Sequence, residues 1–164
     1  MVELRDRSTA LIAPRSGRAE AVAAVLQERF GCAMPAMGAV TRSSRLILAR
    51  TAPHQILAMR DILAMRDGPG LFAELESALA GEGGVIDLSD ARVGVVVSGP
   101  SARERLMTLL PVDLAALRNG GCVQTVMAHI GVLVCRTEDT PAYELHCAAS
   151  YRGSFLRALE LAGL

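Results

Sequence analysis

Short runs of apolar residues, bounded by Gly, Pro, Asn or Asp, recur along the chain and are typical of β-strands. Two of these runs, 45–50 and 56–60, flank a turn at 51–55 and therefore predict a β-hairpin. The predicted strands are 9–13, 45–50, 56–60, 85–88, 93–97, 122–129, 131–136 and 142–148.

Apolar residues three or four positions apart predict helices between the strands. The first helix is expected to start at an N-cap formed by Ser16 and to end at Gly31. Val22, Leu26 and Phe30 lie on one face of this helix, so that face should pack against the predicted sheet.

Three further helices and one helical turn are predicted by the same spacing. The second helix covers about 71–80, with an apolar stripe of Phe72, Leu75 and Leu79. The third starts at a capping box formed by Ser101 and Glu104 and ends before Pro111. A short turn of helix is expected at 114–117, and the last helix starts near Ser150 and buries Phe155, Leu156 and Leu159.

The order of these elements indicates the fold class. Strands and helices alternate irregularly, and several strand pairs are joined by hairpin turns. This pattern predicts an α+β fold with a mostly antiparallel sheet and flanking helices. With 164 residues the chain has about the length of one domain, so a single domain is expected over residues 1–164.

One hexapeptide, ILAMRD, occurs at 56–61 and again at 62–67. Two copies of six residues are too short and too few for a repeat architecture. A small duplication that lengthens the predicted hairpin is the simpler interpretation, and strand register can slip at such a place.

The net charge of the chain argues against some classes of binding partner. Seventeen basic and seventeen acidic residues cancel, so no broad field attracts nucleic acid or an anionic membrane. All the basic residues are Arg, which excludes the lysines of P-loops, Schiff bases and general bases. The first residues are charged and no stretch has the length of a membrane span, so a cytoplasmic location is expected.

Candidate chemistry is sparse. Cys32, Cys122, Cys135 and Cys147 lack zinc spacing and are expected to be buried thiols. No nucleotide, hydrolase or metal motif is present, and the Gly81–Gly84 cluster precedes a strand, as a turn does. His54 is expected in a turn, and His129 and His146 in strands. A nucleophile set of Cys122, His129 and Asp113 has no local signature, so no catalytic, cofactor or metal residue is assigned.

The second half of the chain carries short motifs in a characteristic order: D-x-S-D, G-P-S-A, P-x-D-L, G-C-V-Q-T and a Ser-aromatic start to the last helix. In this order they resemble the gamma subunit of heterotetrameric sarcosine oxidases and related N-methyl amino acid oxidoreductases. The resemblance covers essentially the whole chain, although the turn at 51–56 lacks the Trp usual in the family. The motif residues are Asp87, Ser89, Gly99, Pro100, Asp113, Leu114, Cys122, Gln124, Thr125 and Ser150.

Physical roles in folding can be assigned to several motif residues. Gly99 and Pro100 can stop a strand and start a helix. Asp113 can bind backbone N–H groups in a turn, and Gln124 and Thr125 must face opposite sides of a strand. These residues are therefore expected to be structural or interface residues rather than catalytic ones.

The resemblance implies a fold similar to the first domain of the glycine-cleavage aminomethyltransferase. It also implies a non-catalytic gamma subunit of a flavin-dependent complex that oxidatively demethylates sarcosine or a similar N-methyl amino acid. The partners would then be the alpha, beta and delta subunits, which would carry the FAD, FMN, NAD, tetrahydrofolate and zinc. The isolated chain is expected to be inactive and, with 51% hydrophobic residues and no net charge, to form dimers or aggregates.

Two other interpretations remain. A stand-alone folate-binding one-carbon protein needs an acidic residue for the pterin and apolar or aromatic walls, and the chain has only five aromatic residues. A stand-alone hydrolase needs a nucleophile signature, which the sequence lacks.

Overall fold

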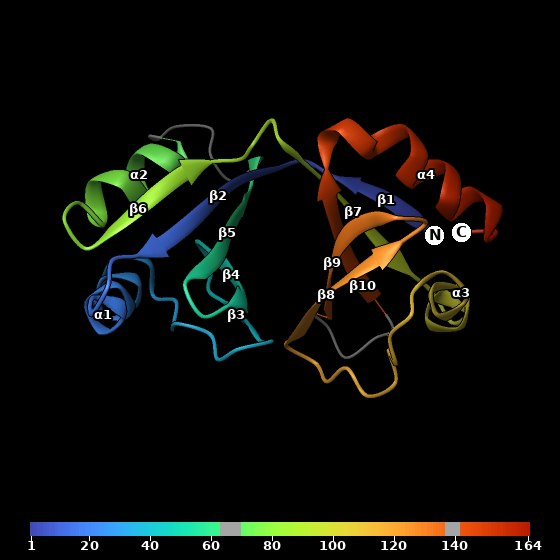
Figure 1. Ribbon diagram of the computed structural model, residues 1–164, viewed down its shortest axis with the longest axis horizontal. Helices are drawn as coiled ribbons and strands as arrows, with labels where there is room; N and C mark the ends of the chain where they lie inside the picture. The colour runs from blue at the N-terminus through green and yellow to red at the C-terminus, as the bar shows by residue number, and fades with distance from the viewer. Residues whose placement is uncertain (63–69, 137–141) are drawn as a thin grey trace. The chain divides into compact units, whose positions relative to one another are not determined.

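The computed structural model describes residues 1–62, 70–136 and 142–164. Its strands form two antiparallel five-stranded sheets, shown in Figure 1. The strands are β1 (Val2–Arg5), β2 (Arg7–Pro14), β3 (Val40–Arg42), β4 (Ile47–Ala52), β5 (Gln55–Asp61), β6 (Gly83–Asp87), β7 (Arg92–Ser98), β8 (Gly121–Met127), β9 (Ile130–Arg136) and β10 (Ala142–Ala148). The helices are α1 (Ala19–Phe30), α2 (Leu71–Ala78), α3 (Ala102–Leu109) and α4 (Arg152–Leu161), the last preceded by a 3-10 turn, η2 (Ala149–Tyr151).

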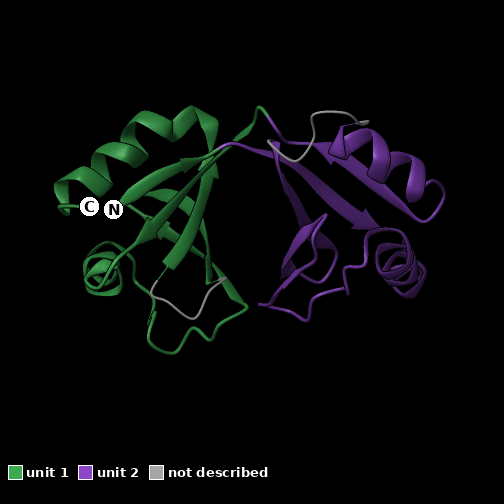
Figure 2. Cartoon of the chain, turned by 180° about the vertical axis from the view of Figure 1, so that it is seen from behind, with its two compact units in different colours: residues 1–5, 90–164 green, residues 6–89 purple. Residues whose placement is uncertain are grey.

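The chain divides into two compact units, coloured separately in Figure 2. Unit 1 combines residues 1–5 with residues 90–164, and unit 2 is the continuous segment 6–89. The predicted α+β class and antiparallel pairing are confirmed, but the strands are shared between two sheets, each with its own core. The single domain over residues 1–164 stays a prediction.

Unit 2 is built on a sheet of order β3-β4-β5-β2-β6. β4 and β5 form the predicted hairpin, and β5 also pairs with β2. Helices α1 and α2 contribute their apolar faces to a core with the sheet, and the largest fully buried side chains include Ile12, Leu26, Leu48, Ile56 and Leu75.

Helix α1 confirms one predicted end and corrects the other. Its C-terminal residue is followed by Gly31 in the left-handed region, with φ 62°, as the sequence predicts. The N-cap is Arg18 rather than Ser16, and its side chain makes no capping hydrogen bond. The predicted buried face of Val22, Leu26 and Phe30 is confirmed.

Other segments of unit 2 differ from the prediction in detail. Helix α2 starts at Leu71 as predicted, but Leu71, rather than Phe72, is fully buried in line with Leu75 and Leu79, because residues four positions apart lie on the same helix face. The expected loop at 31–44 contains β3, which pairs with β4. The first ILAMRD copy lies in β5, and the second lies outside the described residues except for Ile62.

Unit 1 is built on a sheet of order β1-β7-β10-β9-β8. Strand β10 is central and pairs with both β7 and β9. One face of this sheet packs on α3 and α4, with a core that includes Val95, Leu106, Val134, Leu145 and Phe155. Strand β1, which the sequence pattern missed, pairs with β7.

Three predictions for unit 1 are wrong in detail. β8 and β9 are joined by a two-residue turn, Ala128 and His129, both with positive φ, so His129 lies in a turn rather than a strand. Ser101 makes no capping hydrogen bond because its φ of −96° and ψ of 3° differ from the extended N-cap conformation. The predicted helical turn at 114–117 is a hydrogen-bonded turn, and the predicted turn at 137–141 lies outside the described residues.

The last helix is close to its prediction. Its start was predicted near Ser150; Ser150 lies in the turn η2, and the helix itself begins at Arg152. Phe155 and Leu159 are buried as predicted, whereas Leu156 is only partly buried. Within residues 1–62, 70–136 and 142–164, no helix has the length and apolarity needed to cross a membrane.

Candidate functional site

The motif residues lie on several elements of both units. In unit 2, Asp87 is the last residue of β6, and Ser89 lies two residues after it. The other motif residues belong to unit 1 and lie between β7 and α3, in the loop before β8, on β8 and in η2. Their contacts show what each can contribute.

Ser89 joins the end of β6 to the neighbouring strand β2. Its hydroxyl donates to Oδ1 of Asp87 over 2.7 Å and accepts from the backbone N–H of Thr9 over 3.1 Å. It also lies 3.1 Å from the hydroxyl of Ser8. The D-x-S segment therefore continues the contact of β6 with β2 after the regular pairing has ended at Asp87.

Replacing Ser89 with Ala should lower the free energy of unfolding by about 1–2 kcal/mol, because the N–H of the buried Thr9 loses its acceptor. Urea unfolding of the two proteins measures the difference. Ser77→Ala, at an exposed position of α2, is the control and should change stability by less than about 0.5 kcal/mol. Equal effects of the two substitutions would contradict this role of Ser89.

Gly99 sits where the chain leaves β7 for α3. Its φ is +116°, a region that L side chains rarely adopt, so the motif needs glycine here. The carbonyl of Gly99 accepts from the N–H of Ala102, the first residue of α3. The Gly99-Pro100 pair thus ends the strand and starts the helix, as the sequence suggests.

Asp113 holds the turn before β8. Its Oδ1 accepts from the backbone N–H groups of Ala115 over 2.8 Å and Ala116 over 3.3 Å. This turn places Leu114 in the core of unit 1, where it is fully buried. Both residues of the P-x-D-L motif are explained by this turn.

Replacing Asp113 with Ala should lower the free energy of unfolding by about 1 kcal/mol, by analogy with loss of a helix-capping side chain. Asp113→Asn keeps an acceptor oxygen and should retain most of the stability. Thermal unfolding of the three proteins measures the effect. If the alanine variant were as stable as the wild type, the turn would not depend on this carboxylate.

The three motif residues on β8 face both sides of the sheet. Thr125 pairs with Val132 and shares the face that packs on the helices. Gln124 is on the opposite face and its side chain is exposed. Cys122 is buried on the same face as Gln124 and pairs in register with Cys135. The predicted opposite orientation of Gln124 and Thr125 is therefore confirmed.

The Cys122, His129 and Asp113 set is spread along this part of unit 1. Cys122 lies at the first end of β8, and His129 lies in the turn beyond its other end. Asp113 is occupied in its own turn. These positions give no nucleophile–base pair.

All four cysteines are buried, as predicted. Burial raises the pKa of the Cys32 and Cys147 thiols, so both are protonated near neutral pH and are weak nucleophiles. Among the described residues, no group of three or more His, Cys, Asp or Glu side chains could hold a metal ion.

A surface cleft of about 510 Å³ lies between α1 and α2 in unit 2. Its apolar wall is formed by Phe30, Ala73 and Ala78. The guanidinium of Arg45 lies over the Phe30 ring, 5.6 Å from its centroid, which is within the range of a cation–π contact.

Glu74 is the acidic group of this cleft and is held by two arginines. Arg60 donates to Oε2 of Glu74 over 2.8 Å, and Arg45 donates to the same oxygen over 3.4 Å. The hydrogen bond from Arg60 lowers the pKa of Glu74; burial opposes this, and the positive charges of Arg60 and Arg45 add to the lowering. A carboxylate with a lowered pKa is a weak general base, so Glu74 is poorly suited to accept a proton in catalysis.

Sequence reasoning missed this cluster because its residues are far apart in the chain. They lie in α1 (Phe30), in the loop before β4 (Arg45), in β5 (Arg60) and in α2 (Glu74). The available signal was Arg60, the charged last residue of the predicted strand 56–60, whose other residues are apolar. Its side chain is only 9% exposed, and a buried Arg needs a partner.

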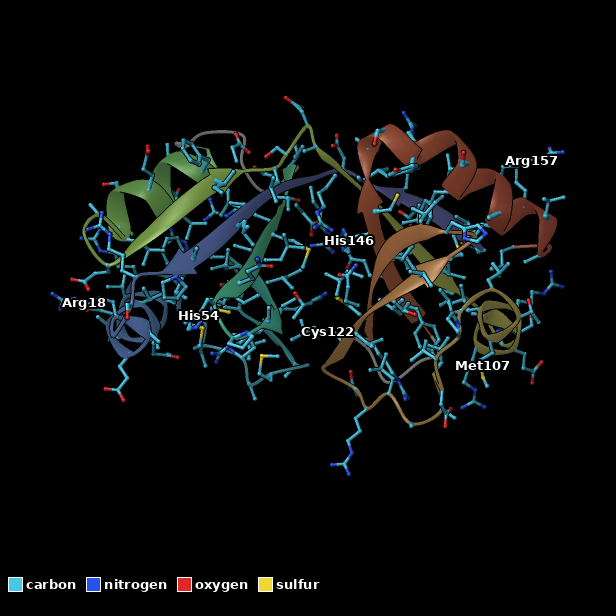
Figure 3. All side chains as sticks on the ribbon, viewed as in Figure 1. Arg18, His54, Met107, Cys122, His146 and Arg157 are labelled. Carbon is cyan, nitrogen blue, oxygen red and sulfur yellow. The ribbon has the colours of Figure 1, made fainter. Side chains whose placement is uncertain are left out.

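Strand β10 carries a second buried ionisable pair, Glu144 and His146, labelled at His146 in Figure 3. Oε1 of Glu144 lies 3.1 Å from Nε2 of His146, and their side chains are 3% and 2% exposed. Both residues are on the sheet face opposite α3 and α4, because Tyr143, Leu145 and Cys147 face the core.

Gly94 on β7 makes room for the imidazole of His146, its partner in register. A Cβ at position 94 would lie 2.9 Å from Cε1 and Nδ1 of His146. The glycine and the buried histidine therefore form one packing unit. The sequence placed His146 correctly in a strand but gave no sign of this pairing.

Comparison with known proteins agrees with the sequence motifs. No protein-family model matches the chain. Sarcosine oxidase subunit gamma from Arthrobacter sp. is 42% identical over 82 residues, which are 48% of this chain and 40% of that protein. The match therefore spans less than half the length of this relative.

Two solved structures share the fold. Heterotetrameric sarcosine oxidase from Corynebacterium sp. U-96, in complex with pyrrole 2-carboxylate, has a chain with a TM-score of 0.83 and 25% identity. The similarity covers 99% of this chain and 82% of that one. Aminomethyltransferase T of the glycine cleavage system from Bartonella henselae gives a TM-score of 0.69 at 16% identity, over 96% of this chain and 44% of that one. The resemblance to the gamma subunit and the aminomethyltransferase-like fold are confirmed.

Proposed function

We propose that this chain is a gamma-type subunit of a heterotetrameric sarcosine oxidase-like complex that acts on sarcosine or a similar N-methyl amino acid. The observation that carries the proposal is the shared fold over 99% of this chain and 82% of a sarcosine oxidase chain. The 42% identity to a gamma subunit over 82 residues supports the same assignment.

The role that we propose for the chain is assembly rather than chemistry. Asp113 and Ser89 are occupied with backbone groups of their own unit, and Glu74 is neutralised by arginines. On this proposal the alpha, beta and delta subunits hold the FAD, FMN, NAD, tetrahydrofolate and zinc. The cytoplasmic location stays a prediction.

A stand-alone folate-binding protein is the alternative. Its fold would be the one shared with the aminomethyltransferase. The cleft in unit 2 fits a pterin poorly, because its carboxylate, Glu74, already accepts hydrogen bonds from Arg45 and Arg60.

Co-expression with the other three subunits of a sarcosine oxidase from the same organism tests the proposal. We expect the four chains to co-elute and to consume oxygen when sarcosine is added. Omitting this chain should remove the assembled complex, and the chain alone should show neither flavin absorbance nor turnover. A chain that does not co-elute and binds tetrahydrofolate by itself would overturn the proposal and favour the alternative.

A further inference from the structure

Strand β8 ends the sheet of unit 1 and leaves one of its two sides unpaired. It has β9 on its inner side, with seven residue pairs from Gly121–Arg136 to Met127–Ile130. None of residues 1–62, 70–136 and 142–164 forms a strand on its outer side.

The turn between β8 and β9 determines which backbone groups point outward. Ala128 and His129 both have positive φ, as in the two-residue turns whose flanking residues exchange two hydrogen bonds. Along each strand of an antiparallel pair, residues that are hydrogen-bonded to the partner strand alternate with residues whose N–H and C=O groups point away from that partner. Counting back from Met127, the outward groups include those of Val126 and Gln124.

The other sheet edges are protected, and β8 is not. Glu3 and Arg5 place charges on the edge strand β1. Strand β3 has only three residues, and β6 begins with two glycines and ends at Asp87. Strand β8, with the sequence GCVQTVM, has seven residues with no charge and no proline. Proteins rarely leave such an edge open, since it pairs readily with another strand.

The exposed side chains along β8 also indicate that a partner strand binds at this edge. Val126 is 51% exposed, and Gln124, on the same face, is exposed as well. The exposed position of Gln124 gives it no part in the core of unit 1, although it belongs to the motif that resembles gamma subunits. Uncharged side chains beside backbone groups that point away from β9 suit an extended, uncharged partner segment.

We propose that β8 is a docking edge on which another subunit of the complex adds a β-strand with uncharged side chains. This inference rests on the proposed function and specifies where the partner binds. The added strand would pair with the outward N–H and C=O groups of Gln124 and Val126 and cover the exposed side chain of Val126.

Substitutions at Val126 test the proposal. Val126→Pro removes an outward N–H but no hydrogen bond to β9, so the chain should fold and bind its partner at least about tenfold more weakly. Val126→Lys adds the charge that protects natural edges and should weaken binding similarly. Val126→Thr keeps the N–H and the branched side chain and is the matched control.

Co-elution with the other subunits gives the affinities, and amide hydrogen exchange locates the contact. We expect the amides of Gln124 and Val126 to exchange rapidly in the isolated chain and slowly in the complex. Binding of both Val126→Pro and Val126→Lys at wild-type affinity, or rapid exchange of these amides in the complex, would overturn the proposal.

The same experiments distinguish two other outcomes from docking of another subunit at β8. Protection that grows with the concentration of the isolated chain would assign the edge to a second copy and overturn docking of another subunit. Failure of the wild-type chain to co-elute would overturn the proposed function itself, whereas normal co-elution of every Val126 variant would overturn only the docking edge.

Discussion

Replacing Glu74 with Gln should lower the free energy of unfolding by about 2–3 kcal/mol at neutral pH. The substitution leaves the guanidinium of Arg60, whose side chain is 9% exposed, without its carboxylate. Loss of one partner from a fully buried ion pair costs about 3–5 kcal/mol, and the 18% exposure of Glu74 reduces this value. Urea unfolding measures the loss, and Glu76→Gln on the exposed face of α2 is the matched control.

The effect of Glu74→Gln should also depend on pH. The pKa of Glu74 is lowered in the folded chain by the hydrogen bond from Arg60, so the unfolded chain binds its proton first as the pH falls. The stability that Glu74 contributes is therefore complete above its ordinary pKa of 4.5 and is lost as the pH falls through the folded value. The difference between wild type and variant should shrink from pH 7 to pH 3. A difference that stayed constant over this range would show that the carboxylate charge does not stabilise the fold.

Replacing Gly94 with Ala should lower the free energy of unfolding by about 2 kcal/mol, because the new Cβ lies 2.9 Å from the imidazole of His146. The imidazole cannot yield easily, since its side chain is 2% exposed and it is paired with Glu144. Thermal unfolding gives the change in stability, and the NMR shifts of His146 should move.

Gly131→Ala is the matched control in the same sheet, because the nearest atom to its Cβ would be the Gln124 amide nitrogen at 3.8 Å. It should change stability by less than about 0.5 kcal/mol. If the two glycine substitutions had equal effects, strand entropy rather than contact with His146 would explain them.

Elements with strong local signals were predicted well. The hairpin of β4 and β5 has alternating and apolar runs around a short turn, and Gly31 ends α1 because its φ of 62° suits glycine. These features depend on residues close together in the sequence. The same holds for the turn at Asp113, whose acceptor and donors are two and three positions apart.

Features that depend on distant residues were missed. Two of the four residues of strand β1 are charged, so its sequence does not have the pattern of a strand. It forms because it pairs with β7, which is distant in the sequence. The division into two sheets and the cluster around Glu74 likewise join segments far apart in the chain. Ser101 shows the opposite error. The local sequence predicts a capping hydrogen bond from its side chain, but the structure has none, because the backbone between Gly99 and α3 does not adopt the usual N-cap conformation.

The pairing of β1 with β7 has a consequence for the order of folding during synthesis. Val2 emerges from the ribosome early but pairs with Val97, whereas every strand pair of unit 2 lies within residues 6–89. Unit 2 can therefore complete its sheet while β1 still waits for its partner. We expect unit 1 to form after unit 2 on the nascent chain. Until then, the charges of Glu3 and Arg5 discourage β1 from pairing with a wrong strand edge.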